Sequence, residues 1–335
     1  MHPNFYQRLN QRIVLGTIAA AVMQFAAPQA HAQAQPEAPL GVYQGAGCGG
    51  AERLTQFATW IGFRPSLVLE FMSWEALTQN SAWSMDCWSK AGIKEITYSV
   101  PMLPEDGSAT LAQGAAGRFD TLFQNFAKRL VQRGYPNAII RIGWEMNGDW
   151  YPWAASKDPQ AWIAYWRRIV DIMRAVPGQQ FKFDWCPGNG WTNLLAQDVY
   201  PGDDYVDIIG MDVYNNSWNQ QVVTPEQRWN EQVNGRHGLK WHAQFAAARG
   251  KPISFPEWGT GIRRDGRGAG DDPFFIEQMA EWIASNNVAY HIYWDYSAPI
   301  FQGRISDGSQ PRAAEAFLRK FKRPRPRAPV LDEAR

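Results

Sequence analysis

Cysteine, histidine and net charge are all scarce in this sequence of 335 residues. Its three cysteines exclude a disulfide-rich scaffold. Five histidines are present, and no histidine or cysteine pair has the spacing of a zinc site. A net charge of +1 provides no strong field for nucleic acid or for an anionic membrane surface. We therefore expect no metal ion and no nucleic-acid partner.

Nucleotide-binding motifs are also missing. The glycine-rich stretch from Gly45 to Gly50 has neither the GxGxxG spacing of a dinucleotide site nor the lysine of a phosphate-binding loop. We interpret this stretch as a tight turn. The sequence thus predicts a protein without a cofactor.

The chain lacks an apolar run of the roughly 20 residues that a membrane-spanning helix needs. A shorter apolar run, residues 13–27, follows two arginines and leads to Ala30-His31-Ala32. This pattern predicts a secretory signal over residues 1–32 with cleavage before Gln33, and hence a secreted or periplasmic protein. An uncleaved signal anchor is the alternative, and it would leave the same domain outside the cytoplasmic membrane.

After the leader, short apolar runs alternate with longer amphipathic segments, as in repeated β-α units. We expect a short linker over 33–40, a single (β/α)8 TIM barrel over 41–322, and a disordered tail over 323–335 that is rich in proline and charge. An open doubly wound sheet is the alternative fold. The eight expected strands are 42–46, 67–72, 95–100, 138–144, 181–185, 206–211, 252–256 and 289–294. The clearest helical patterns are 118–133, 159–175, 239–249, 273–285 and 313–321.

The odd number of cysteines permits at most one disulfide within the chain. Connectivity cannot be read from the sequence. Cys48 with Cys87 is the preferred pairing, since both lie early in the chain near predicted strand-to-helix connections.

Tryptophan, by contrast, is abundant, with 17 residues, many of them beside predicted strand ends. The stretch Arg141 to Trp153 reads RIGWEMNGDWYPW and places Glu145 where the fourth strand gives way to a loop. Glu257 follows the seventh strand in a similar context, PEWG. In a barrel these two strand ends face each other across the mouth, so both acids can address one substrate. Two such carboxyl groups are what glycosidic cleavage requires.

The two motifs resemble those of glycoside hydrolase family 26, the β-mannanase family of clan A. WEMNG with WYPW resembles the acid/base motif, and PEWG resembles the nucleophile segment. The resemblance implies a TIM barrel and a retaining mechanism, with Glu145 as general acid/base and Glu257 as nucleophile. It also implies an endo-β-glycosidase that acts on β-1,4-mannan or a related β-glycan.

The family usually has histidine immediately before the acid/base glutamate, and this chain has Trp144. An indole donates one hydrogen bond and offers a large apolar face, whereas an imidazole can bind through two nitrogens. This departure bears on the choice of sugar more than on the reaction type.

Further residues are candidates for contact with substrate or support of the two acids. Arg141 lies on the same face of its strand as Glu145, so we assign it a supporting role. By the family resemblance, Tyr214 orients the nucleophile. The full set of candidate substrate-binding residues is Trp144, Trp150, Trp153, Tyr214, Trp258 and Trp294. For each of them, packing in the barrel is the alternative.

Two other functions fit the same residues. A glycanase could trim the producer's own exopolysaccharide during export, and a barrel without activity could bind a glycan. We expect a monomer whose only partner is a polysaccharide, with no stable insertion in a membrane after signal cleavage.

Overall fold

The computed structural model describes residues 37–322 except 191, 220 and 222–223. The expected leader over 1–32, most of the linker and the tail over 323–335 lie outside the described residues. The described residues belong to one compact unit that begins at Glu37. No helix in this part of the chain has both the length and the apolar character to cross a bilayer.

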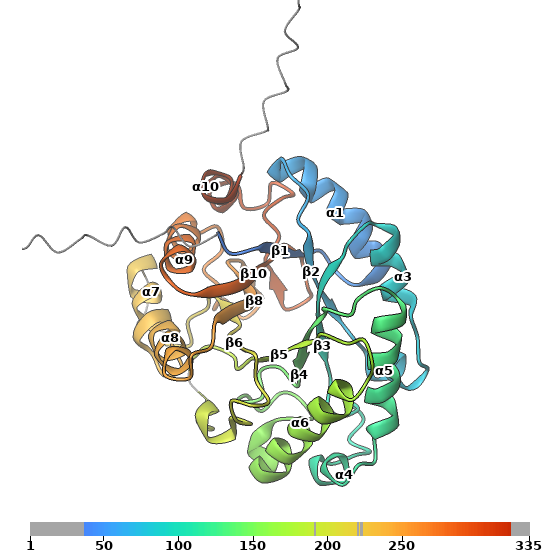
Figure 1. Cartoon of the computed structure of the whole chain (residues 1–335). Coiled ribbons are helices and arrows are strands. Elements are labelled where there is room, and N and C mark those ends of the chain that lie inside the picture. The colour runs from blue at the N-terminus through green and yellow to red at the C-terminus, as the bar shows by residue number, and fades with distance from the viewer. Residues whose placement is uncertain (1–36, 191, 220, 222–223, 323–335) are drawn as a thin grey trace, which may run out of the picture. The chain divides into compact units, whose positions relative to one another are not determined.

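Eight parallel strands close into a barrel surrounded by helices (Figure 1). The order is β1-β2-β3-β4-β5-β6-β8-β10, and pairing of β10 with β1 closes the ring. The strands are β1 Leu40–Tyr43, β2 Leu67–Phe71, β3 Glu95–Val100, β4 Ile139–Ile142, β5 Lys182–Trp185, β6 Ile208–Gly210, β8 Ile253–Gly259 and β10 Val288–Trp294. The predicted TIM barrel is confirmed.

The helices form the outer layer, and three short strands lie outside the ring. The helices are α1 Gly47–Ile61, α2 Trp74–Thr78, α3 Trp83–Lys90, α4 Leu111–Ala115, α5 Asp120–Gln132, α6 Pro159–Arg174, α7 Pro225–Asn234, α8 Leu239–Ala247, α9 Pro273–Ser285 and α10 Pro311–Phe321. Strand β7 Val213–Tyr214 pairs with the end of β8, and β9 Ile262–Arg263 pairs with β11 Phe301–Gln302.

Glycines at the start of α1 correct the expected tight turn. Gly47 to Gly50 form the first helical turn, and the first strand ends earlier, at Tyr43. A Cβ atom on Gly50 would lie 2.0 Å from the carbonyl oxygen of Gly45, so only glycine lets the helix begin this close to the preceding loop.

The side chains of the barrel divide into an inner and an outer core because strand residues alternate between the two faces. The inner core contains Tyr43, Leu67, Leu69, Ile208, Tyr290 and Ile292, with Trp294 packed against it. The outer core joins the strands to the helices and includes Val68, Ile140, Phe183 and Phe255. Trp294 therefore points into the barrel, which settles the orientation of β10.

A bulge in β8 changes which residues of this strand face inward. Phe255 pairs with His291 and Trp258 with Tyr293, so three steps along β8 match two along β10. The extra residue turns Glu257 inward and Trp258 outward. Without this bulge, simple alternation from Ser254 would have placed Trp258 inside the barrel.

The disulfide joins Cys48 of α1 to Cys87 of α3, which confirms the preferred pairing. Cys186 is a free, buried cysteine. The bond closes a loop of 39 residues that contains β2. It thereby ties the first helix of the outer layer to the third.

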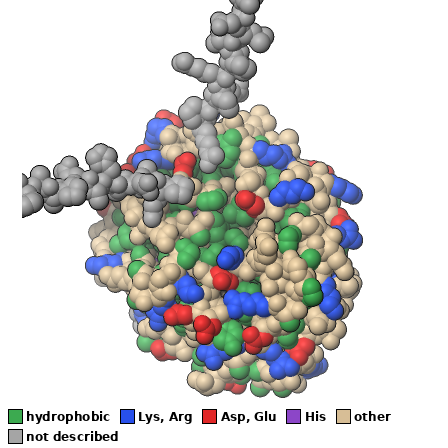
Figure 2. Space-filling model, in the orientation of Figure 1, with side chains coloured by type: hydrophobic (Ala, Val, Ile, Leu, Met, Phe, Trp, Pro, Cys, Tyr) green, Lys and Arg blue, Asp and Glu red, His purple; other side chains and the backbone are tan. Residues whose placement is uncertain are grey.

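Figure 2 shows the surface of the molecule in the orientation of Figure 1. Apolar side chains gather near the middle of this face, with charged side chains of both signs around them. The mixture of signs agrees with the small net charge of the whole chain.

Candidate active site

Glu145 lies three residues beyond the end of β4, in a conformation that is unusual for a side-chain-bearing residue. Its φ is +51°, and Gly143 before it has the same value. The backbone N–H of Glu145 donates to the carbonyl oxygen of Cys186 (2.8 Å), and its carbonyl oxygen accepts from Gly148 (3.0 Å). These hydrogen bonds stabilise the left-handed backbone conformation of Glu145, and such conformations are common at functional sites.

Asn147 ties this loop to the loop that follows β5. Its side-chain amide donates to the carbonyl oxygen of Gly188, and its carbonyl accepts from the N–H of the same residue, both at 2.9 Å. Gly188 in turn lies against Glu145, since a Cβ atom there would come within 3.3 Å of the carboxylate oxygen Oε1. Asn147 thus positions the acid without touching it, and the sequence analysis missed this role.

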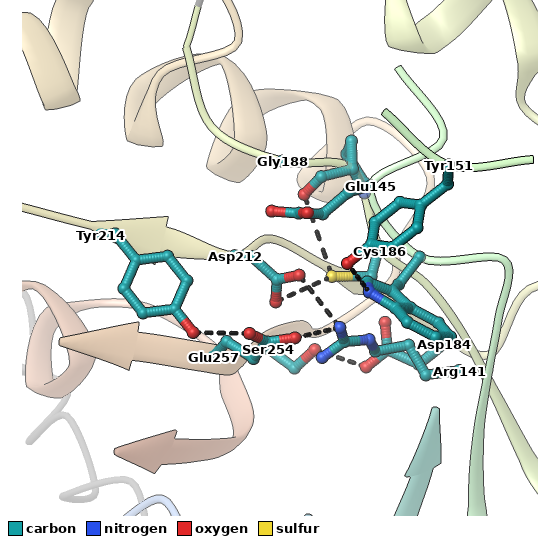
Figure 3. A network of polar contacts seen from close by, with 12 residues as sticks. Arg141, Glu145, Tyr151, Asp184, Cys186, Gly188, Asp212, Tyr214, Ser254 and Glu257 are labelled. Atoms are coloured by element: carbon teal, nitrogen blue, oxygen red, sulfur yellow. Dashed lines mark hydrogen bonds and ion pairs between the residues drawn. The ribbon is translucent and has the colours of Figure 1, made fainter. Parts of the chain in front are cut away.

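Glu257 lies inside β8, where two donors reach its carboxylate. The Arg141 guanidinium forms a short ion pair with Oε1, and the Tyr214 hydroxyl donates to Oε2 at 2.5 Å. Figure 3 shows Tyr214 and Arg141 approaching Glu257 from opposite sides. The negative charge of Glu257 is therefore compensated at both oxygens.

Arg141 connects Glu257 to a third carboxylate, Asp212. The guanidinium lies 3.1 Å from Oδ2 of Asp212, and the Cys186 thiol donates to Oδ1 at 3.4 Å. Burial would lower the pKa of Arg141, but the neighbouring carboxylates Asp212 and Glu257 raise it well above its ordinary value. Arg141 is fully buried and stays charged, as its predicted supporting role requires.

Asp212 is not among the candidate site residues that the sequence predicts. Its position at a strand end was the available signal. Burial raises the pKa of this carboxyl, Arg141 acts against the rise, and Glu257 adds to it.

Glu145 and Glu257 face a common region around the Arg141 guanidinium (Figure 3). Burial and the negative charge of Glu257 together raise the pKa of Glu145 to about 7, while Arg141 and a hydrogen bond from Trp150 oppose the rise. The two acids therefore have different environments. One carboxyl can hold a proton near neutral pH, and the other has two donors that compensate its charge.

Three of the predicted tryptophans border this region. The Nε1 atom of Trp150 donates to Oε2 of Glu145 at 3.0 Å, and the side chain is 56% exposed. Trp144 donates to the Tyr151 hydroxyl at 2.9 Å, and its ring lies 5.5 Å from the Arg141 guanidinium carbon. Trp294 stacks on Tyr43 at 4.3 Å between ring centres.

The structure corrects the expectation for two other tryptophans. Trp258 is fully buried on the outer face of β8, donates to His291 (3.2 Å) and stacks on Phe317 of α10. Trp153 is 1% exposed and donates to the carbonyl oxygen of Trp144. Both side chains are therefore packed inside the protein, which favours the packing alternative for these two residues.

Metal ligands do not converge anywhere in the described residues, because no group of three or more His, Cys, Asp or Glu side chains could hold an ion. The donors around Glu257 are instead cationic and phenolic. The arrangement suits proton transfer and nucleophilic attack by carboxyl groups.

Comparison with known proteins confirms the resemblance predicted from the sequence. Residues 116–257 match the model of glycosyl hydrolase family 26. A mannan endo-1,4-beta-mannosidase of Bifidobacterium adolescentis is 30% identical over 168 residues, which is 47% of this chain and 16% of that protein. Endoglucanase H of Acetivibrio thermocellus is 42% identical over 97 residues, which is 25% of this chain and 10% of that protein. The chain thus spans a small part of the length of these relatives.

A similar fold occurs in a modular endo-β-1,4-mannanase from Cellulomonas fimi. The TM-score is 0.65 at 18% sequence identity, over 86% of this chain and 71% of the other. This likeness concerns the architecture of the barrel.

Proposed function

From the resemblance of this chain to glycosyl hydrolase family 26, we propose that it is a retaining endo-β-glycanase. The observation that supports the proposal best is the pair Glu145 and Glu257, which come from the loop after β4 and from strand β8 and differ in their surroundings. The proposed substrate is β-1,4-mannan or a related β-glycan, in keeping with the names of the two relatives.

Glu145 is the proposed general acid. Its raised pKa lets it carry a proton near neutral pH and give that proton to the glycosidic oxygen of the leaving sugar. Glu257 attacks the anomeric carbon as the bond to that oxygen breaks, and a covalent glycosyl ester forms on Glu257. Arg141 and Tyr214 orient the attacking carboxylate.

Water completes the reaction. Glu145, now ionised, takes a proton from a water molecule, which attacks the anomeric carbon and releases Glu257. Two inversions give a product with the original anomeric configuration. Trp150 and Trp294 border the region where the sugars lie and offer aromatic surface for stacking.

We also propose that the protein is exported and acts as a monomer. The apolar segment 13–27 and the sequence Ala30-His31-Ala32 support export. Because Trp144 replaces the histidine that is usual for the family, an exopolysaccharide of the producing cell is the alternative substrate. The two readings share one mechanism and differ in the polymer.

Product analysis tests the reaction type. Wild type, Glu145→Ala and Glu257→Ala are incubated with a panel of neutral β-glycans, and new reducing ends are measured. We expect cleavage by the wild type and a loss of at least a hundredfold in both variants. Full activity in both variants would show the assignment to be wrong, and tight binding without cleavage would favour the glycan-binding alternative.

An aryl β-glycoside with a good leaving group separates the roles of the two acids. Departure of that group needs no proton, so Glu145→Ala should form the glycosyl ester and then stall. Azide should restore turnover of Glu145→Ala as a β-glycosyl azide, and it should not restore a β-product in Glu257→Ala. The reverse pattern would exchange the two roles.

A further inference from the structure

Trp218 is an exposed tryptophan whose ring lies near two arginines. Its side chain is 61% exposed. The guanidinium carbon of Arg267 lies 4.3 Å from the ring centre, and that of Arg263 lies 5.3 Å from it. Such cation–π contacts hold flexible arginine side chains in defined positions at the surface.

Backbone bonds join the two loops that carry these residues. The N–H of Ser217 donates to the carbonyl oxygen of Arg267 at 3.0 Å, and Asn216 forms a β-bridge with Gly268. Trp218, Arg263 and Arg267 therefore form one surface, the Trp218 surface, that is built from the loop after β7 and the segment after β8.

The Trp218 surface adjoins the candidate active site. Arg263 belongs to β9, which follows directly after the strand that carries Glu257, and it pairs with Phe301 of β11. The ring of Phe301 packs against Tyr214 at 4.7 Å, and Tyr214 donates to Glu257. The positive charge of Arg263 also acts on Glu145, where it lowers the pKa and so opposes the larger effect of burial. A polymer that passes both glutamates on this side would therefore meet the Trp218 surface.

Positive charge is concentrated here although the chain as a whole carries only +1. Residues 262–268 contain Arg263, Arg264 and Arg267 but a single acid, Asp265. Asp265 pairs with Arg263 at 3.1 Å. No carboxylate of the described residues forms an ion pair with Arg264 or Arg267. The positive charges of Arg264 and Arg267 are therefore not compensated by an ion pair within the described residues.

We propose that the Trp218 surface binds an acidic sugar unit, a uronic acid or another carboxylated sugar, of the polysaccharide that the active site cleaves. The proposal rests on the proposed function and narrows its substrate. A guanidinium matches a carboxylate with two parallel hydrogen bonds, and a neutral mannan offers no group of that kind. Ion pairing at an exposed surface is weakened by salt, so the contribution of the arginines should depend on ionic strength.

Binding is tested with one polymer in two forms, neutral glucomannan and the same glucomannan partly oxidised at C6 to uronic acid. Glu257→Gln serves as the background, so that the polymer is not degraded. Native gels that contain either polymer report affinity as retardation of the protein. We expect stronger retardation by the oxidised form, a loss of about tenfold in that affinity in Arg263→Gln/Arg267→Gln, and unchanged affinity for the neutral form.

Arg133→Gln is the matched control. Arg133, like Arg263, is paired with one aspartate, Asp86, but its side chain is 47% exposed and it follows α5 at the end of the barrel remote from the strand carboxyl ends. This variant should bind both polymers as the background does. Circular dichroism and thermal unfolding establish that all variants are folded.

Three results would overturn the proposal: equal retardation by the two polymers, preference for the oxidised form that survives the double substitution, or tighter binding of a sulfated glucomannan than of the oxidised one. The assay needs no hydrolysis. Failure of the wild type to cleave any β-glycan would therefore count against the proposed function alone.

Discussion

The indole Nε1 of Trp150 donates a hydrogen bond to Oε2 of Glu145 across 3.0 Å, and more than half of the Trp150 side chain is exposed. The carboxyl group of the proposed general acid is thus hydrogen-bonded to a tryptophan that is accessible from the barrel mouth. A donor of this kind favours the ionised form of the acid. Trp150 therefore links the occupancy of the mouth to the protonation of Glu145.

Trp150→Phe should move the alkaline limb of the pH profile of kcat/KM to higher pH by about half a unit. The substitution keeps an aromatic ring and removes the donor that lowers the pKa of Glu145. The acid then holds its proton further into the alkaline range. The measurement is kcat/KM against pH with a soluble β-glycan, and Trp83→Phe, which alters an exposed tryptophan without this bond, is the control. An alkaline limb that moves down or stays in place would contradict the prediction.

Tyr214→Phe should reduce kcat roughly 10- to 100-fold with little loss of stability. The phenol donates to Oε2 of Glu257 at 2.5 Å, and phenylalanine keeps the packing of the ring on Phe301. Because the bond orients the nucleophile, formation of the glycosyl ester should slow more than its hydrolysis. Pre-steady-state release of an aryl leaving group measures the first step. An undiminished burst rate would show that the bond does not assist attack.

Trp258→Ala should lower the free energy of unfolding by about 3–5 kcal/mol and leave KM unchanged. The side chain fills space between β8 and α10 and has no exposure. Urea unfolding and initial rates on the same preparations compare the two effects. Trp150→Ala, at an exposed position, should show the opposite pattern. A rise in KM with full stability in Trp258→Ala would restore this residue as a ligand contact.

Glu70→Gln should reduce the loss of stability that the folded protein undergoes between about pH 4.5 and pH 7. Burial raises the pKa of Glu70 to about 7, so folding takes up a proton in this range and stability falls as the pH rises. Gly47 N–H and Trp88 Nε1 both donate to the one oxygen Oε2 at 2.8 and 2.5 Å, and a glutamine carbonyl can accept both bonds.

Thermal unfolding of wild type and Glu70→Gln across this pH range gives the difference directly. The stability of the variant relative to that of the wild type should increase as the pH rises to about 7, and the difference should then stay constant. Exposed Glu52 on α1 supplies the control Glu52→Gln. A constant offset at every pH would show that Glu70 takes up no proton on folding.

Removal of the disulfide by Cys48→Ala/Cys87→Ala should lower the free energy of unfolding by about 4 kcal/mol, the value for a closed loop of this length. The measurement is urea unfolding with and without reductant, and the reductant should affect the wild type alone. Cys186→Ala tests the free thiol separately. Equal stability of wild type and double variant would mean that the bond does not form in solution.

The order of strands and helices was predictable because each segment carries its own pattern. Alternating apolar runs and amphipathic stretches identify β-α units from residues close together in the chain. The location of Glu145 and Glu257 at strand ends was predictable for the same reason, since each is an isolated acid within a distinctive motif. The local sequence did not reveal that Gly47 to Gly50 begin a helix, because the fit of those glycines depends on Gly45 and on Trp83 of another helix.

Contacts between residues across the barrel could not be predicted from the sequence and were known only from the tertiary structure. Trp258 and Trp153 share the local context of Trp150, yet a bulge and a packed loop turn them away from the mouth. Asp212, Asn147 and Arg141 acquire their roles from partners between 41 and 116 positions away. The sequence by itself determined the barrel and the location of the two acids at strand ends, since periodicity and motif are properties of neighbouring residues. Only the closed barrel decided which side chains surround those acids, because strand register and the bulge in β8 fix the direction of each side chain.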